Sequence, residues 1–564
     1  MDRTLGYLSL LIRERGISAK YFRRAMCPWA LRILGVLVAT HGLRAQSLAP
    51  KQRVVTLEVP GQEADNLHRM DPASWTDSTG SYLIRSTGRR LPLLARDGIT
   101  YVDIINPEFR ATWNSQLPWS QNDGASRGSV GWNFVTRLGV ILETGPVRVI
   151  FAPEIISAEN REFLTIPFAD LSTRSMWANP FHPAPESIDL PIRFGRNPRH
   201  TTVKGQSSVS IDLGKSTIGF ADDNMWWGPG VRNALLVSSN AEGVPRLFVR
   251  TRSPVDTRLG RFDAEWFLGR LQESAFFDND STNNSRSLAG VVLTWRPPHS
   301  RNVELGFGRL VITPLTNGEM SLGAAFDVLH DIGRPNTAPK HAGNYSAPDQ
   351  LFSFFGRVAV PEHGFEAWAE WARTEQPLSL RDMLEDPAHS QLYTVGAQAV
   401  RAFADTSTHL RLGIEATYLE PSPSSRFKPL LTSYTSHAVL QGFTHDGQLL
   451  GPAIGPGSSS QYLSLDYLRP RWNIGFFAGR IRYDNGTLFE SIVPQVKNAD
   501  ISVYSGLRGA MQYRGVRISA EFQSTVRLAY LFQSYNANLE NGEKAGIDFR
   551  NRTLSIVLSP AKGF

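Results

Sequence analysis

Cysteine is nearly absent from this 564-residue chain, in which Cys27 is the single example. Beyond that position the sequence can form no disulfide, no cysteine-ligated zinc site and no cysteine nucleophile. Long apolar runs are also absent, because no stretch of about 18 apolar residues follows residue 45, and a membrane-spanning helix there is excluded. A closed β-barrel is the other structure that satisfies its backbone in lipid, so a membrane location stays open.

The formal net charge of +7 belongs almost wholly to the first 45 residues. They contain eight basic and two acidic residues, whereas the remaining 519 contain 51 basic and 50 acidic residues. Neither part holds a Lys/Arg-rich run of the kind that binds nucleic acid. We therefore expect no nucleic-acid partner.

Residues 1–45 have the pattern of an export leader. Met26 is the expected start of a signal peptide, with a basic first part, an apolar stretch from Ile33 to Thr40 and a small residue, Ala45, at the cleavage position. Cys27 precedes the apolar stretch rather than following it, which excludes a lipoprotein anchor. A buried N-terminal helix is the alternative interpretation.

Residues 129–564 show the alternation of a barrel wall. Phe262, Ala264, Trp266 and Leu268 alternate with Arg261, Asp263 and Glu265, and about a dozen further segments share this pattern. Turn residues separate the segments and no domain linker interrupts them, which argues against a set of soluble sandwiches. We predict an all-β fold, a transmembrane antiparallel β-barrel of about 18 strands.

Residues 46–128 consist of short basic and apolar pieces without sustained alternation, and within them Val102 to Thr112 could be strand or helix. We predict that they form a small N-terminal periplasmic cap or plug that is partly helical. A flexible tail is the alternative. The expected organisation is therefore a leader at 1–45, a cap or plug at 46–128 and a barrel at 129–564.

Three tests for catalysis or metal binding fail. The stretch from Gly214 to Thr217 imitates the end of a phosphate loop, but Val209 stands where the loop needs its first glycine. The twelve histidines form no metal-ligand spacing. A glycosidase needs two carboxylates about 5 to 9.5 Å apart on opposite sides of a sugar bond, whereas Asp263 and Glu265 share one strand face. We predict no catalytic residue, no metal, no cofactor and no enzymatic activity.

The most unusual segment is the block Asn224-Met225-Trp226-Trp227-Gly228-Pro229-Gly230. Two adjacent indoles beside acids and amides suit a sugar, whose C–H faces rest on rings while its hydroxyls need polar partners. A tryptophan pair in the interfacial aromatic belt of a barrel is the equally good alternative.

Around this block the sequence resembles the capsule assembly Wzi family of outer-membrane proteins. The likeness spans roughly residues 110–470 and is carried by several groups of residues: Asn114, Ser115, Pro118, Asn122, Asp123 and Gly124; Ile188, Asp189, Leu190, Pro191, Arg193, Phe194 and Gly195; Asn224, Trp226, Trp227, Gly228, Pro229, Gly230, Asn233, Ser238, Asn240, Ala241 and Pro245; and Gly442, Phe443, Thr444, His445, Gly451, Pro452 and Gly455. The double-Trp block is its most specific part. Two departures are Ser126 to Ser129, where the family tends to carry a Trp and a Gly-Arg-Gly run, and Phe443 in place of a usual Tyr.

The resemblance implies an 18-stranded outer-membrane barrel with a helical periplasmic portion. It also implies a lectin-like protein that holds capsular polysaccharide at the cell surface. Of the 51 basic residues after residue 45, 43 are Arg and eight are Lys. The planar guanidinium suits uronate and phosphate groups, so we expect an acidic surface polysaccharide as the partner, beside outer-membrane lipid and the barrel-assembly machinery.

Eight residues are predicted to contact the polymer: Trp226, Trp227, Arg232, Asn233, Asn240, Trp368, His445 and Asp446. Gly228, Pro229 and Gly230 form the turn of the motif, directly after Trp226 and Trp227. The hypothesis is a lectin-like barrel that binds capsular polysaccharide or exopolysaccharide and helps to attach or assemble it at the cell surface. An outer-membrane porin or transporter for small solutes is the main alternative, and a surface glycan hydrolase is the weaker one.

Overall fold

A computed structural model describes most of the chain from residue 54 onward. The described ranges are 54–75, 80–91, 101–166, 171–182, 187–315, 318–329, 348–374, 380–403, 407–422, 424, 432–436, 438–490, 498–533 and 547–561. The predicted signal peptide lies outside them. Residues 52–564 make one compact unit, and the description below concerns that unit.

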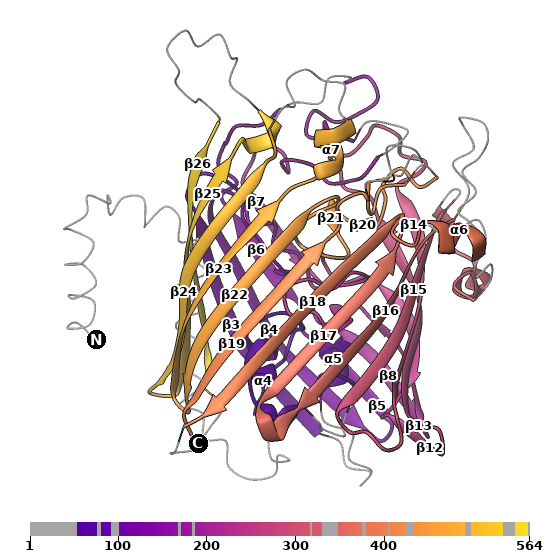
Figure 1. The fold of residues 1–564 in the computed structure, drawn as a ribbon, viewed down its shortest axis with the longest axis vertical. Coiled ribbons are helices and arrows are strands. Elements are labelled where there is room, and N and C mark those ends of the chain that lie inside the picture. The colour runs from indigo at the N-terminus through magenta and orange to yellow at the C-terminus, as the bar shows by residue number, and fades with distance from the viewer. Residues whose placement is uncertain are drawn as a thin grey trace, which may run out of the picture. The chain divides into compact units, whose positions relative to one another are not determined.

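The unit is built on one closed antiparallel sheet (Figure 1). Its wall segments are β3 (Tyr101–Asn114), β4 (Gly131–Thr144), β5 (Val147–Phe151), β6 (Glu154–Ala158), β7 (Arg199–Val203), β8 (Ser208–Leu213), β9 (Ser216–Ala221), β11 (Arg246–Thr251), β12 (Val255–Thr257), β13 (Gly260–Gln272), β14 (Ser285–Arg296), β15 (Val303–Pro314), β16 (Asp349–Val360), β17 (Phe365–Arg373), β18 (Gln391–Ala402), β19 (His409–Tyr418), β22 (Ser459–Arg469), β23 (Trp472–Arg482), β24 (Ile501–Tyr513), β25 (Val516–Leu528) and β26 (Phe549–Pro560).

These segments form 18 wall strands, because three strands are each interrupted once. Both β5 and β6 pair with β4, β7 and β8 continue each other beside them, and both β11 and β12 pair with β13. The barrel closes where β26 pairs with β3, with Leu554 opposite Trp113. The predicted fold class and strand number are confirmed.

The closing strand changes the expected domain boundary. β3 begins at Tyr101 and is a full wall strand between β26 and β4. The wall therefore begins at residue 101, and the cap or plug is shorter than residues 46–128. The sequence pattern left Val102 to Thr112 open between strand and helix, because a β-bulge shifts the register between Ile105 and Glu108 and breaks the alternation in the middle of the strand.

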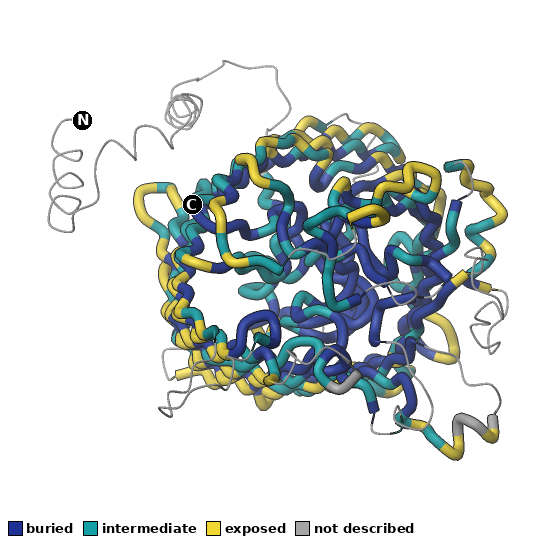
Figure 2. The backbone as a smooth tube through the Cα atoms, turned by 90° about the horizontal axis from the view of Figure 1, so that it is seen from above, coloured by how far each residue is buried: buried dark blue, intermediate teal, exposed yellow. Residues whose placement is uncertain are grey.

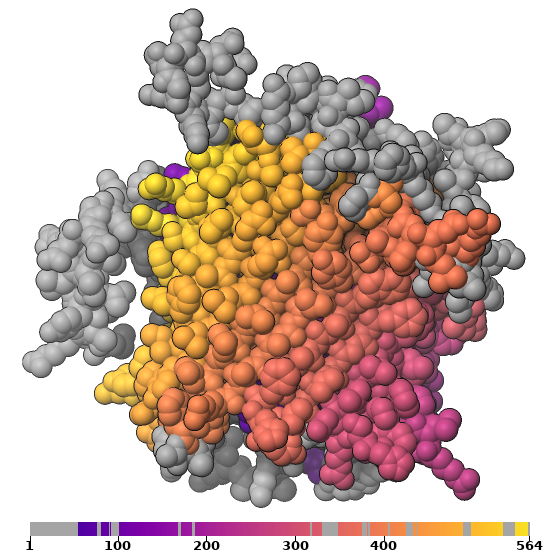
Figure 3. All heavy atoms as spheres, viewed as in Figure 1, coloured from indigo at the N-terminus to yellow at the C-terminus, as the bar shows by residue number. Residues whose placement is uncertain are grey.

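Alternation along each wall strand separates an apolar outer face from a polar inner face. On β4, Leu138, Val140 and Leu142 are exposed on the outside, whereas Arg137 is 2% exposed and points inward. The same alternation of faces holds on β24 and β25, and Figure 3 shows the continuous outer surface that these strands make with their neighbours. Apolar side chains outward and polar side chains inward are the pattern of a barrel in lipid.

The two ends of the barrel differ in the length of their connections. One end, the short-turn end, has turns such as residues 145–146, 470–471 and 514–515. The other, the long-loop end, has connections such as residues 159–198, 419–458 and 529–548. In outer-membrane barrels short turns lie in the periplasm and long loops lie outside the cell. None of the described helices is long and apolar enough to cross a membrane.

Shorter elements line the interior or decorate the loops. They are β1 (Val54–Val55), α4 (Glu63–Arg69), η1 (Pro72–Ser74), β2 (Ile84–Ser86), α5 (Thr87–Arg90), β10 (Met225–Trp227), η3 (Leu322–Phe326), η4 (Pro361–His363), α6 (Leu380–Glu385), β20 (Thr444–His445), β21 (Gln448–Leu449), α7 (Asn485–Glu490) and η6 (Tyr530–Phe532). Figure 2 looks down the barrel and shows buried chain across much of the space inside the wall.

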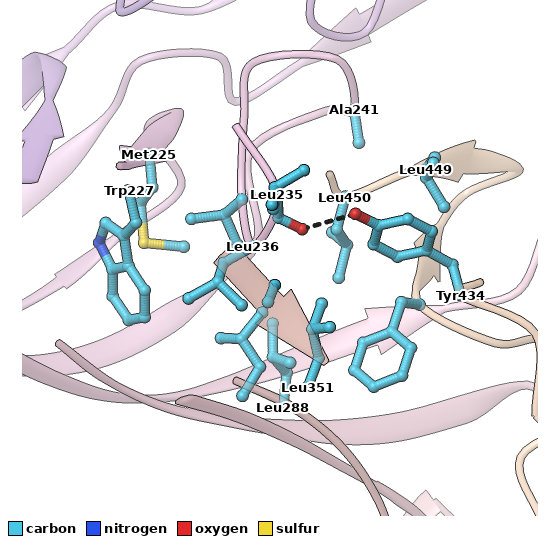
Figure 4. Close-up of a cluster of buried hydrophobic side chains, with 14 of the residues drawn as sticks. Met225, Trp227, Leu235, Leu236, Ala241, Leu288, Leu351, Tyr434, Leu449 and Leu450 are labelled. Atoms are coloured by element: carbon cyan, nitrogen blue, oxygen red, sulfur yellow. Dashed lines mark hydrogen bonds between the residues drawn. The ribbon is translucent and has the colours of Figure 1, made fainter. Parts of the chain in front are cut away.

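The interior core joins three segments that are far apart in the sequence. β2 of the N-terminal segment, by which we mean residues 54–75 and 80–91, pairs with β10 of the connection 222–245, and residues 432–457 pack beside them. Figure 4 shows part of this core, where Leu235 and Leu236 lie among side chains of the wall and of the third segment. The Tyr434 hydroxyl donates a hydrogen bond of 2.8 Å to the Leu235 carbonyl, so the two inner segments are also joined by a polar contact.

Candidate functional site

The two tryptophans of the central motif are packed inside the barrel. Trp226 and Trp227 lie on β10 and are both 0% exposed. The Arg85 guanidinium lies 5.0 Å from the Trp226 ring, and Trp227 makes an edge-to-face contact with Phe267 of the wall at 5.4 Å. Neither indole offers a face to a ligand in this structure. Their position is that of core residues, which is neither of the two interpretations that the sequence suggested.

The Gly-Pro-Gly turn connects this motif to the N-terminal segment. Gly228 adopts φ +107°, and its N–H donates to the Leu83 carbonyl at 2.8 Å. A Cβ on Gly228 would lie 2.5 Å from a carboxylate oxygen of Glu370. The Pro229 and Gly230 carbonyls accept hydrogen bonds from Arg69. Only glycine fits the first position, and the turn fastens the N-terminal segment inside the barrel.

A buried carboxylate holds the chain after the turn. Glu415 on β19 accepts hydrogen bonds from the backbone N–H groups of Val231 (2.6 Å), Arg232 (2.9 Å) and Asn233 (3.0 Å). The Trp368 indole also donates to Glu415, at 3.3 Å, and is 5% exposed. The amide of Asn233, itself 3% exposed, donates to Thr417 and Ser460. These contacts position the loop, and Glu415 is a residue that the sequence analysis missed.

Arg232 is the member of the motif that reaches a half-exposed inner surface. Its guanidinium lies 4.8 Å from the Tyr462 ring and donates to the Gln121 side chain. On the neighbouring wall Arg508 pairs with Asp466 at 2.8 Å. We call this set the Arg232 group: Gln121, Arg232, Tyr462, Asp466 and Arg508. It combines a ring face with two guanidinium groups, one amide and one carboxylate, and its three wall residues lie on β22 and β24.

A second polar group lies where β7 and the β20–β21 hairpin meet near the long-loop end. Asp446, in the turn of the hairpin, pairs with Arg127 and lies 3.8 Å from Arg199. Its side chain is 33% exposed, and that of Arg199 is 25% exposed. Glu242 is half-buried beside them. We call Arg127, Arg199, Glu242 and Asp446 the Asp446 cluster.

An aromatic face adjoins the Asp446 cluster. The Arg127 guanidinium lies 3.7 Å from the Phe194 ring, which makes an edge-to-face contact with Phe276 at 5.9 Å. Asp446 adopts φ +48°, a conformation that directs the hairpin turn, and its N–H donates to the Gln272 carbonyl at 2.9 Å. The cluster thus has two cations, two carboxylates and ring surface on a framework anchored to the wall.

The electrostatics of this cluster favour a neutral Glu242. Burial, aided by the charge of Asp446, raises the pKa of Glu242 to about 7. His445 differs, because burial lowers its pKa to about 4 and its Nδ1 accepts a hydrogen bond of 3.1 Å from the Gln272 N–H. His445 is 5% exposed and acts as a neutral structural acceptor near pH 7. Asn240, half-buried, donates to the Leu449 carbonyl at 3.0 Å.

The structure therefore divides the eight predicted contact residues. Trp226, Trp227, Asn233, Trp368 and His445 are buried, whereas Arg232, Asn240 and Asp446 keep partly exposed side chains. The sequence analysis missed Arg127, Arg199 and Glu242 as site residues. Arg127 had one signal, since it stands in the stretch that departs from the family pattern.

The acid pair weighed for glycoside hydrolysis is paired with one guanidinium. Arg89, from the N-terminal segment, binds both Asp263 and Glu265, and both acids are 2% exposed. Arg261, which was expected beside them, pairs instead with Asp256 at 2.8 Å. The two acids thus serve to hold the N-terminal segment against β13.

Solved structures of other proteins are similar to this chain, and the likeness to the first of those named here supports the fold. The outer-membrane protein Wzi of Escherichia coli, described as involved in group 1 capsule assembly and as a carbohydrate-binding β-barrel, shares 11% identity with this chain at a TM-score of 0.52, covering 81% of this chain and 85% of that one. OccAB2 of Acinetobacter baumannii shares 8% identity (TM-score 0.39; 82% and 98% covered). OprD of Pseudomonas aeruginosa shares 9% identity (TM-score 0.37; 86% and 99% covered). The search of curated proteins finds no match.

The sequence itself carries the family assignment. The family described as capsule assembly protein Wzi matches residues 197–516, which include the double-Trp block, the Asp446 hairpin and most of the wall. That match covers more than half of the chain, and the 18-strand barrel agrees with it. The chain therefore belongs to the capsule assembly protein Wzi family and is a β-barrel of the outer membrane.

Proposed function

We propose that the protein is a non-enzymatic, lectin-like barrel that binds an acidic capsular polysaccharide or exopolysaccharide and helps to attach or assemble it at the cell surface. The observation that carries the proposal is the Asp446 cluster, in which the partly exposed side chains of Arg199 and Asp446 lie beside the buried Arg127 and ring surface at the long-loop end. Family membership and the likeness to a carbohydrate-binding barrel support it.

The chemistry of the cluster suits an acidic sugar. Arg199 can present a planar pair of N–H donors to a uronate or phosphate, as guanidinium groups do in carboxylate recognition. Asp446 and Glu242 can accept from sugar hydroxyls, and Asn240 adds an amide nearby. The Arg232 group offers a second contact deeper in the barrel, with Tyr462 as the ring on which a sugar face rests.

The test is binding of the host's own surface polysaccharide to the refolded full chain, measured by co-sedimentation. Arg199→Ala should weaken binding by about tenfold, as expected for the loss of one charge-assisted contact. Arg514→Ala is the matched control, because Arg514 is an exposed arginine in a turn at the short-turn end. Undiminished binding by Arg199→Ala together with Arg232→Ala would refute the proposed surface.

A further inference from the structure

The outer face of the barrel carries a small set of charged residues that the glycan proposal does not use. Outward strand positions in the described wall hold arginine but no aspartate or glutamate. Near the long-loop end they include Arg550 and Arg552 on β26 and Arg480 on β23, whereas Arg309 lies midway along β15. An arginine on the lipid face is costly at the bilayer midplane and much less costly near the headgroups, so its height and its partners matter.

The fold covers some of these arginines and leaves others open. Arg309 is 3% exposed, because it donates to the Val328 carbonyl at 2.7 Å and to Gln350 at 3.1 Å. Arg480 donates to Gln461 at 3.3 Å. Arg550 and Arg552 are exposed, and their guanidinium groups make no hydrogen bond or ion pair with any residue that the structure describes.

The strand register places Arg480, Arg550 and Arg552 close together on the same outer surface, on strands that are three spacings apart. Arg480 is opposite Val503, Val503 is opposite Val526, and Val526 is opposite Arg550. Three strand spacings put Arg480 and Arg550 about 14 Å apart. Arg552 lies two residues along β26 from Arg550, about 7 Å away on the same face. The patch therefore presents three cations around exposed Val503 and Val526.

The height of this patch matches the headgroup region. Arg550 is the second residue of β26, directly after a long-loop connection. Two residues beyond Arg552, Leu554 lies opposite Trp113, which lies opposite Trp132 on the next strand. Trp132 stacks on Phe134 with ring centroids 5.8 Å apart. Outward tryptophans form the interfacial belt of membrane proteins, so the arginines lie at or above that belt.

We propose that Arg480, Arg550 and Arg552 form a binding site for a phosphorylated lipid headgroup in the outer leaflet. Guanidinium groups bind phosphate through paired N–H donors, and the acyl chains of such a lipid would lie on the apolar wall below. Two hydrogen bonds to Ser115 hold the backbone of Arg552 in place. The Arg552 N–H donates to Ser115 Oγ at 2.7 Å, and the Arg552 carbonyl accepts from the Ser115 N–H at 3.0 Å.

The experiment measures binding of bisphosphorylated lipid A to the purified full chain in neutral detergent. Arg550→Gln combined with Arg552→Gln should weaken binding at least about tenfold, since two charge-assisted contacts are lost. The matched control, Arg469→Gln combined with Arg514→Gln, removes two exposed arginines at the short-turn end and should change binding less than about twofold. Equal binding by the Arg550/Arg552 variant and the wild type would overturn the proposal.

Two further arms identify the ligand. Lipid A stripped of its phosphates should bind the wild type as weakly as bisphosphorylated lipid A binds the double variant, and equal binding of the two lipids by the wild type would refute phosphate recognition. Inorganic phosphate at the same phosphate concentration should not displace the lipid, and full displacement would assign the site to phosphate alone.

If the double variant does not fold, lipid affinity of the wild type must still fall with rising ionic strength, and a salt-independent affinity would contradict the site. Polysaccharide binding by the double variant should be unchanged, which separates this site from the proposed glycan surface.

Discussion

Gly228 shows how one backbone conformation holds the interior together. Its φ of +107° is open to glycine and strained for any other residue, and the Glu370 carboxylate fills the space where a Cβ would project. The turn that it forms carries the carbonyls that Arg69 and Arg85 bind. The N-terminal segment therefore needs a glycine at position 228 in order to bind inside the barrel.

Gly228→Ala should lower the free energy of unfolding by about 2–4 kcal/mol, as backbone strain and the clash with Glu370 add. Denaturant unfolding of the refolded barrel measures the change. Gly214→Ala is the matched control, since Gly214 has φ +65° but has no atom within 4 Å of its would-be Cβ. Its cost should stay near 1 kcal/mol. Equal losses for the two variants would contradict the proposed role of the Glu370 contact.

Glu242 gives the Asp446 cluster a pH dependence. Its pKa of about 7 lies above its ordinary value of 4.5, so the folded protein binds this proton more tightly than the unfolded chain does. The stability that the proton contributes is present below pH 4.5 and is lost as pH rises toward 7. The cluster gains a negative charge as pH rises through about 7, where Glu242 of the folded protein ionises.

Binding of an acidic polysaccharide should therefore weaken as pH rises through about 7, because ionised Glu242 repels the polymer's carboxylates. Glu242→Gln should bind at high pH as the wild type does at low pH, and its pH profile should be flatter. Co-sedimentation of the host polymer at several pH values measures both. A wild-type profile as flat as that of Glu242→Gln would contradict this role.

At the scale of elements, the pairing of β2 with β10 explains the double-Trp motif. Trp226 lies opposite Arg85 and packs against Gly61, so the motif forms the surface on which the N-terminal segment docks. Arg89 at α5 reaches Asp263 and Glu265 of β13, and Arg69 at the end of α4 reaches Glu366 of β17 at 2.7 Å. Ion pairs and the short β2–β10 ladder together fix the segment inside the barrel.

Trp226→Ala should expose the N-terminal segment to solvent, since truncating a buried tryptophan costs about 3–5 kcal/mol. Hydrogen exchange of residues 80–91 and 223–240 should accelerate, while exchange of the wall strands should change little. Trp472→Ala on the outer wall is the control, because this residue is 42% exposed and its ring contacts Tyr467 of the wall. Unchanged protection of residues 80–91 in Trp226→Ala would show that the motif does not dock that segment.

The comparison between sequence and structure also belongs to this scale. Period-two alternation predicted the wall, because each strand records its inner and outer faces locally. The β-bulge at Ile105 to Glu108 left β3 open between strand and helix, since one bulge exchanges the inner and outer faces of the strand. Burial of Trp226 could not be predicted from the sequence. Its partner Arg85 is 141 positions away along the chain, and composition does not show that β2 pairs with β10. The Asp446 cluster draws on residues 127, 199, 242 and 446, a set without any local spacing.

At the scale of the whole molecule, the wall and the interior have different tasks. The wall alone would enclose a wide polar lumen, the arrangement of a porin. Here the N-terminal segment and the connection 222–245 meet across that lumen, and their shared core is buried. The polar groups that stay partly exposed, the Arg232 group and the Asp446 cluster, lie around this inner core. An interior of this kind favours a binding surface over a route for solutes.

The full chain in planar lipid bilayers should therefore give little or no steady single-channel conductance. Arg69→Ala combined with Arg85→Ala removes the two guanidinium groups that bind the Gly228 turn and leaves Asp65 and Glu366 with fewer partners inside the barrel. That variant should show intermittent opening, because a loosened N-terminal segment no longer blocks the lumen continuously. Arg469→Ala combined with Arg514→Ala, at the rim, should conduct as little as the wild type. Large, steady conductance of the wild type that added polysaccharide does not reduce would contradict the occluded interior and favour a porin.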